Sequence, residues 1–151
     1  MDLYGNKDLL SRQLVAFFAS RNSPPEALDK AIEWAQTISR SDKVVISGFH
    51  SPIERVVCDI LLANNRPIVM TLGRARYKRI PPHLRTSFAD GNILFISFSN
   101  LCRANLSSSQ LRNWATTDLA VEIVFAPFRP ESQLSTLLHF LHHTSLAVRV
   151  L

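Results

Sequence analysis

The sequence lacks the segments that mark membrane and secreted proteins. No apolar run approaches the roughly 20 residues that a membrane helix needs, and the longest are short pieces such as 14–19. The first eight residues, Met-Asp-Leu-Tyr-Gly-Asn-Lys-Asp, have neither the basic nor the apolar region of a secretion signal. The two cysteines are too few for a disulfide framework or a metal-ligand pattern. We therefore expect a cytoplasmic protein with free thiols and no membrane association.

The motifs of common nucleotide-dependent enzymes are also missing. There is no Gly-x-Gly-x-x-Gly fingerprint, no Walker loop and no Gly-x-Ser-x-Gly elbow. Cys58 lies in an apolar helical pattern, which favours a core thiol over a nucleophile. His139, His142 and His143 lie near a predicted helix end, where cations are favoured without any metal. No acid–base pair is evident, so we expect no enzyme activity, no cofactor and no metal.

Composition and charge indicate a globular domain with an anionic partner. Hydrophobic residues make up 46% of the 151 residues and charged residues 19%, a balance typical of folded proteins. Seventeen lysines and arginines face 12 acidic residues, which gives a formal net charge of +5. Most of the cations are arginines, whose planar fork matches phosphate oxygens. Charge alone does not identify a nucleic-acid partner, so the positions of the arginines matter.

Apolar, β-rich segments alternate with helical patterns along the chain. Strands are predicted at 14–19, 43–47, 67–72, 92–97, 119–125 and 146–151, and helices at 24–40, 52–63, 82–88 and 131–142. Strands that are apolar throughout are buried on both faces, and intervening helices imply right-handed crossovers. The sequence therefore predicts an α/β, three-layer Rossmann-like sandwich with a mostly parallel sheet of five or six strands. We expect residues 1–151 to form a single domain, with 1–13 as a lead-in on the sheet edge.

Two strand-to-helix junctions repeat one pattern, Ser23-Pro-Pro-Glu26 and Ser51-Pro-Ile-Glu54. A serine N-cap, a proline at the first helical position and a glutamate three residues after the cap form a capping box. Both helices should then start just past the carboxyl ends of strands, at the edge where open α/β sheets bind ligands. A helix N-terminus there favours anions, although most capping boxes only start helices.

Polar and basic residues gather near these strand ends. The candidate nucleotide- or DNA-binding residues are Ser20, Arg21, Asn22, Gly48, Phe49, His50, Ser51, Arg74, Arg76, Lys78, Arg112 and Asn113. Gly48 would let backbone approach a ligand, and Phe49 could stack on a base or pack against the sheet. Segment 73–79 carries four cations and Tyr77, a mixture that suits a nucleic-acid backbone with a stacked base. A solvated surface loop would have the same composition.

Several of these segments resemble a known family. Val15-Ala-Phe-Phe-Ala-Ser-Arg21, a helix, and then Val44-Val-Ile-Ser-Gly48 resemble the start of the Rossmann-like domain of the DprA/Smf DNA-processing family. Ser47-Gly-Phe-His-Ser-Pro-Ile-Glu54 is similar to a compact subgroup in which Ser-Gly-Phe-His-Ser-Pro recurs. Pro67-Ile-Val-Met, with its following arginine, and Arg112-Asn113 resemble later landmarks. The resemblance covers roughly residues 5–126.

The resemblance implies a Rossmann-like domain that binds nucleotides or single-stranded DNA without catalysis, and a homodimer. The contacts that it implies are Ser20, Arg21, Gly48, Arg112 and Asn113. The chain departs from the family where Ala19 replaces a glycine and where 126–130 replaces a glycine-rich segment. The apolar stretch 134–151 also favours a homodimer.

Single-stranded DNA is the leading ligand hypothesis. A sensor of a small nucleotide-derived ligand is the main alternative, because related Rossmann-like domains bind such molecules at the same edge. A phosphoribohydrolase is disfavoured because its Pro-Gly-Gly-x-Gly-Thr loop is missing.

Overall fold

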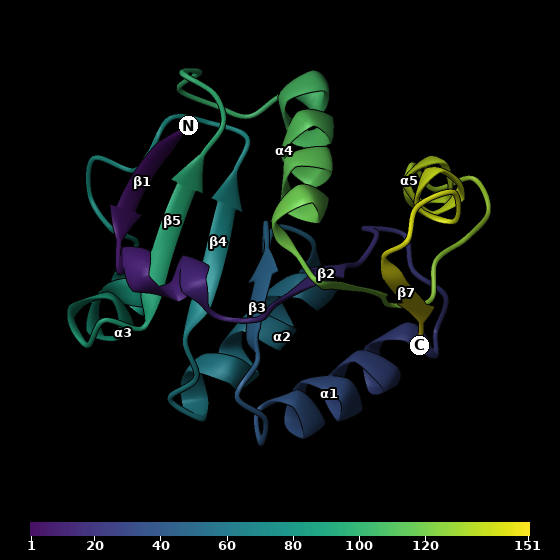
Figure 1. Cartoon of the computed structure of the whole chain (residues 1–151), viewed down its shortest axis with the longest axis horizontal. Helices are drawn as coiled ribbons and strands as arrows, with labels where there is room; N and C mark the ends of the chain where they lie inside the picture. Colours follow the sequence, from purple (N-terminus) through teal and green to yellow (C-terminus); the bar gives the residue numbers. More distant parts are fainter.

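The computed structural model describes all 151 residues and contains one seven-stranded sheet (Figure 1). The strands are β1 (Asp2–Gly5), β2 (Leu14–Phe18), β3 (Val44–Ser47), β4 (Ile68–Leu72), β5 (Ile93–Ser97), β6 (Glu122–Phe125) and β7 (Ala147–Val150), in the order β1-β5-β4-β3-β2-β6-β7. The helices are α1 (Ala27–Ile38), α2 (Pro52–Ala63), α3 (Arg85–Ala89), α4 (Leu106–Leu119) and α5 (Leu134–Leu141). Short 3-10 helices cover Lys7–Ser11 and Pro82–Leu84.

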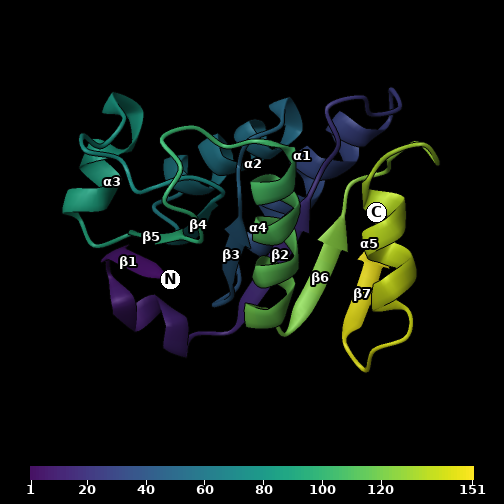
Figure 2. The same cartoon turned by 90° about the horizontal axis from the view of Figure 1, so that it is seen from above.

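Helices cover both faces of the sheet and make the predicted three layers (Figure 2). Helices α1 and α2 pack on one face with the side chains of Val15 and Phe17, whose ring stacks on Trp34 at 4.8 Å. Helices α4 and α5 pack on the other face, where Phe18 lies against Phe125. Strands β2 to β5 are buried at every position because both of their faces are covered. The predicted fold class is confirmed.

The sheet is parallel except at one edge. The first three predicted strands pair in parallel, as expected. Residues 1–13 do lie on the edge, but they add a seventh strand, since β1 pairs antiparallel with β5. Gly5 ends this strand with a φ of 119°, and a Cβ there would lie 2.3 Å from the carbonyl oxygen of Ile93. Four residues, none of them buried, are too short a pattern to reveal a strand in the sequence.

Helix α4 was not predicted, because its buried face is polar. Ser108, Arg112, Thr116 and Thr117 face inward, and the Thr116 hydroxyl donates to that of Thr71 at 2.9 Å. Apolar periodicity, the usual mark of an amphipathic helix, is therefore absent. The prediction of a strand at 119–125 is wrong at its start, because residue 119 ends α4 and the strand begins at residue 122.

The two capping patterns behave differently. Ser51 and Glu54 form the predicted capping box at the start of α2. The box predicted at Ser23 is wrong, because its hydroxyl donates back to the Ser20 carbonyl at 2.8 Å and α1 begins only after Glu26.

The C-terminal stretch is less exposed than its composition suggests. Leu134, Leu137 and Leu141 of α5 are buried in the core, while Phe140 and Val150 are exposed. None of the helices, of which the 14-residue α4 is the longest, combines the length and the apolar character that crossing a membrane would require.

Candidate nucleic-acid interface

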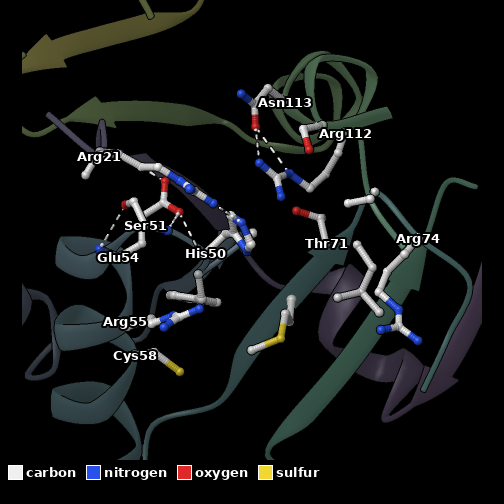
Figure 3. A pocket seen from close by; sticks show the side chains of 18 of the residues that line it. Arg21, His50, Ser51, Glu54, Arg55, Cys58, Thr71, Arg74, Arg112 and Asn113 are labelled. Atoms are coloured by element: carbon white, nitrogen blue, oxygen red, sulfur yellow. Dashed lines mark hydrogen bonds between the residues drawn. The ribbon is translucent and has the colours of Figure 1, made fainter. Parts of the chain in front are cut away.

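A cavity of about 1260 Å³ opens at the carboxyl ends of β2, β3 and β4, beneath the N-terminal half of α4 (Figure 3). The strand order reverses beside it, because β2 has β3 as its neighbour on one side and β6 as its neighbour on the other. Ligands of open α/β sheets bind at such a switch point. The cavity brings together nine of the predicted residues: Ser20, Arg21, Gly48, Phe49, His50, Ser51, Arg74, Arg112 and Asn113. Asn22, Arg76 and Lys78 do not line it.

Arg112 reaches into the cavity from α4 (Figure 3). The residue is only 9% exposed, and its guanidinium packs beside Gly48, where a Cβ would lie 2.7 Å from the Arg112 Cζ. The space beside this glycine was expected to receive a ligand, and Arg112 occupies it instead. Only a residue without a side chain leaves room for the guanidinium, so Gly48 and Arg112 form one structural unit.

The charge of Arg112 has no partner of opposite sign. Its Nε and Nη2 donate to Asn113 Oδ1 at 3.3 and 3.1 Å, and the ion pairs of the protein lie elsewhere, at Lys43–Glu122 and Arg76–Asp2. Burial lowers the pKa of the Arg112 guanidinium, and the charge of Glu54 opposes this effect. An arginine nevertheless stays protonated in proteins. A buried, unpaired cation on the wall of an open cavity favours an anionic ligand.

Glu54 holds the two strand-end loops together. Its Oε2 accepts the N–H of Ala19 at 3.0 Å, and its Oε1 accepts the N–H groups of His50 and Ser51 at 2.9 and 3.1 Å. The side chain is buried beneath the loops. This carboxylate and the Ser51 hydroxyl accept the N–H groups of Ser51 and Glu54, so these two donors at the start of α2 are not available to an anion.

His50 fixes the position of Arg21 at the cavity mouth. The Arg21 Nη2 donates to His50 Nε2 at 2.8 Å, so the imidazole accepts there and is neutral, since a guanidinium has only donors. Partial burial is the largest of the causes that lower the pKa of His50. The charges of Arg112, Arg21 and Arg55 lower it further, while the charge of Glu54 raises it.

We expect His50 to titrate below the ordinary histidine pKa of about 6.5. The folded state then binds fewer protons than the unfolded state, so the contribution to stability is complete above about pH 6.5 and falls as the pH drops toward the folded pKa. An NMR titration of the ring measures this. Arg21→Ala should raise the His50 pKa, whereas Arg12→Ala, which removes an exposed arginine bonded to the Asp42 carbonyl, should not. A wild-type midpoint above 6.5 would disprove the neutral assignment.

The cations of segment 73–79 do not lie together. The Arg74 guanidinium lies over the Tyr77 ring at 4.6 Å, and both residues line the cavity. Arg76 lies over Tyr4 at 4.6 Å, on the wall of a second cavity of about 520 Å³. The exposed Lys78 lines neither of these cavities. The chain turns after Arg74, so neighbouring cations in the sequence reach different places.

Phe49 contributes backbone but no stacking surface. Its side chain is 5% exposed and belongs to the core, and its φ is 46°. The stacking alternative for Phe49 is therefore wrong. Cys58 also borders the cavity, and burial, with a smaller effect of Asp59, raises the pKa of its thiol to about 12. The thiol is inert at neutral pH, in agreement with the predicted core role.

Some residues at the cavity were not among the predicted ligand-binding set. Glu54 was recognised only as part of a capping box, and Arg55 on the next position of α2 also lines the cavity. Arg103 lines it from the segment before α4. Its position after a predicted strand was the only indication in the sequence.

Neither a protein-family model nor a curated protein sequence matches the chain. Solved structures do. DNA processing protein A of Helicobacter pylori matches with a TM-score of 0.77 at 16% identity over 98% of this chain, and DprA of Streptococcus pneumoniae with 0.81 at 18% identity over 98%. The chain has a DprA-like Rossmann fold.

The DprA-like domain is only part of those proteins, because the chain spans 69% of the H. pylori protein and 53% of the S. pneumoniae protein. A molybdenum cofactor carrier protein from Chlamydomonas reinhardtii is more distant, with a TM-score of 0.53 at 11% identity over 92% of this chain and 89% of that protein. The H. pylori protein is described by its single-stranded DNA binding mode. At these identities the matches establish the fold, and the ligand has to be argued from the cavity.

Proposed function

We propose that this DprA-like domain binds single-stranded DNA without catalysis, through phosphate contacts in the cavity at the strand ends. The observation that carries the proposal is the buried, unpaired guanidinium of Arg112. The H. pylori protein with the same fold has a single-stranded DNA binding mode, which supports the same ligand class.

The charge of the cavity supports a polyanion. Arg21, Arg55, Arg74, Arg103 and Arg112 line it, against the carboxylates of Glu54, Asp59 and Glu131. Glu54 is already occupied by three backbone N–H groups. The arginines therefore exceed the free carboxylates, which favours phosphates.

The size of the cavity supports a strand over a mononucleotide. Pockets for small ligands occupy about 300–1,000 Å³, whereas this one measures about 1260 Å³. A chain of nucleotides can thread an open groove of this size. The homodimer stays part of the proposal, with the exposed Phe140 and Val150 as apolar surface that a second copy could cover.

We expect the affinity for a short single strand to fall steeply with salt. Each neutralised phosphate contributes about −0.7 to the slope of log K against log salt, so contacts with Arg21, Arg112 and one further cation give roughly −2. Fluorescence anisotropy of a labelled oligonucleotide at several salt concentrations measures the slope. Arg21→Ala should make it shallower by about 0.7, and the exposed Arg85→Ala, outside the cavity, should leave it unchanged.

The same titration includes a panel of mononucleotides. Tight, base-selective mononucleotide binding with little salt dependence, and no binding of the oligonucleotide at low salt, would instead identify a ligand sensor.

A further inference from the structure

The cavity wall contains a planar cation whose geometry suits a base better than a phosphate. Arg74 lies over Tyr77 with its Cζ 4.6 Å from the ring centroid. The ring is itself held edge-on against Phe95 at 5.8 Å, with 78° between the ring planes. Tyr77, itself held by Phe95, thus supports the guanidinium from one side.

The backbone beneath Arg74 is also fixed. The Ser97 hydroxyl donates to the Arg74 carbonyl, and the Ala75 N–H donates to the Leu101 carbonyl at 2.7 Å. The Arg74 Nε donates to the Ala75 carbonyl at 3.0 Å, which uses one edge of the guanidinium. A side chain held in this way loses little further entropy when a ligand stacks on it.

The phenylalanine and tyrosine rings that line the cavity, Phe49 and Tyr77, are already in contact with other groups. The ring of Phe49 is in the core, and Arg74 covers Tyr77. The guanidinium lies over the tyrosine on one side, and Arg74 is half-buried on the cavity wall. A base would stack on the other side of the guanidinium. Apolar residues also line the cavity, among them Met70, Leu72 and Leu84. Apolar walls and a planar cation make a compartment for a flat, uncharged ring.

We propose that Arg74 is the stacking platform for one nucleobase, in a compartment of the cavity separate from the phosphate contacts at Arg112. The inference rests on the proposed function, and it assigns the base-binding role to a guanidinium plane instead of an aromatic ring. Guanidinium planes stack on bases in single strands as aromatic side chains do. Every base has a face that can stack, so this platform gives base dependence without sequence preference.

The test compares an ordinary oligonucleotide with an abasic strand of the same length and charge. Stacking of one base contributes about 1–3 kcal/mol, so wild-type protein should prefer the ordinary strand by about fivefold or more. Arg74→Lys keeps the charge but removes the plane. It should bring the affinity for the ordinary strand down to that for the abasic strand, while abasic binding and the salt slope stay unchanged.

Arg76→Lys is the matched control, because Arg76 stacks on Tyr4 at the same distance of 4.6 Å but lines the second cavity. It should keep the wild-type preference for bases. Tyr77→Leu, which removes the support of the guanidinium, should repeat the effect of Arg74→Lys. Thermal melts establish that both variants are folded.

Equal binding of both strands by the wild-type protein would disprove the platform and leave phosphate binding standing. Loss of affinity for both strands in Arg74→Lys would also disprove it and make Arg74 a phosphate ligand. If the wild-type protein binds neither strand at low salt, the proposed function itself is wrong.

Discussion

Replacement of Arg112 by methionine is expected to reduce the affinity for single-stranded DNA by on the order of 10- to 100-fold, the equivalent of one charge-assisted contact. The free energy of unfolding should stay unchanged or rise. The guanidinium is buried without an opposite charge, and a methionine of similar length would fill the space without a desolvated cation. Binding titrations and urea unfolding of the same preparations measure the two effects.

The combination of weaker binding and undiminished stability separates a ligand contact from a structural role. Arg66→Met serves as control, because Arg66 is half-buried, has one buried unpaired nitrogen and lies outside the cavity. It removes the same charge and should change the affinity only slightly. A clear drop in the stability of Arg112→Met would show that the arginine holds α4 on the sheet, and wild-type affinity would exclude it as a contact.

Gly48→Ala tests the contact between Gly48 and Arg112 by changing the glycine instead of the arginine. The new methyl group would meet the end of the Arg112 side chain, which can move, and not backbone. The expected defect is therefore in ligand binding, through displacement of the guanidinium.

The fold could be predicted because its determinants are local. Strands β2 to β5 are apolar at almost every position, and a serine, a proline and a glutamate define the start of α2. Helix α4 was not predicted because its inner face is polar. Thr116 on that face forms a hydrogen bond with Thr71 of β4, and Arg112 lines the cavity. The polarity that hid the helix from prediction is the same property that places Arg112 on the cavity wall.

The site could be predicted only in outline. That strand ends meet at one edge follows from parallel topology, and it brought Ser20, Gly48 and Arg74 to one cavity. Which side chains point inward depends on turns that the sequence does not reveal. Arg74 and Arg76 are two positions apart, yet they stack on different tyrosines in different cavities. The bond from Glu54 to Ala19 spans 35 positions and depends on β2 lying beside β3.

That long-range bond leads to the largest expected loss of stability. Glu54→Ala leaves the N–H groups of Ala19, His50 and Ser51 without an acceptor. A buried donor left unsatisfied costs about 1–3 kcal/mol, and Ala19 and Ser51 are both buried. We expect the free energy of unfolding to fall by about 3 kcal/mol or more, measured by urea unfolding. Glu33→Ala, at an exposed position of α1, should change it by less than about 0.5 kcal/mol.

Glu54→Gln distinguishes the two loops that the carboxylate joins. A glutamine has one acceptor oxygen and one donor group in place of two acceptors. Its oxygen can still accept the N–H groups of His50 and Ser51. Its NH₂ group then faces the N–H of Ala19, and because both are donors no hydrogen bond forms there. Hydrogen exchange should therefore accelerate at Ala19 more than at His50 and Ser51, with an intermediate loss of stability. Equal acceleration at all three amides would mean that the capping box, and not the bridge between β2 and β3, dominates the contribution of Glu54.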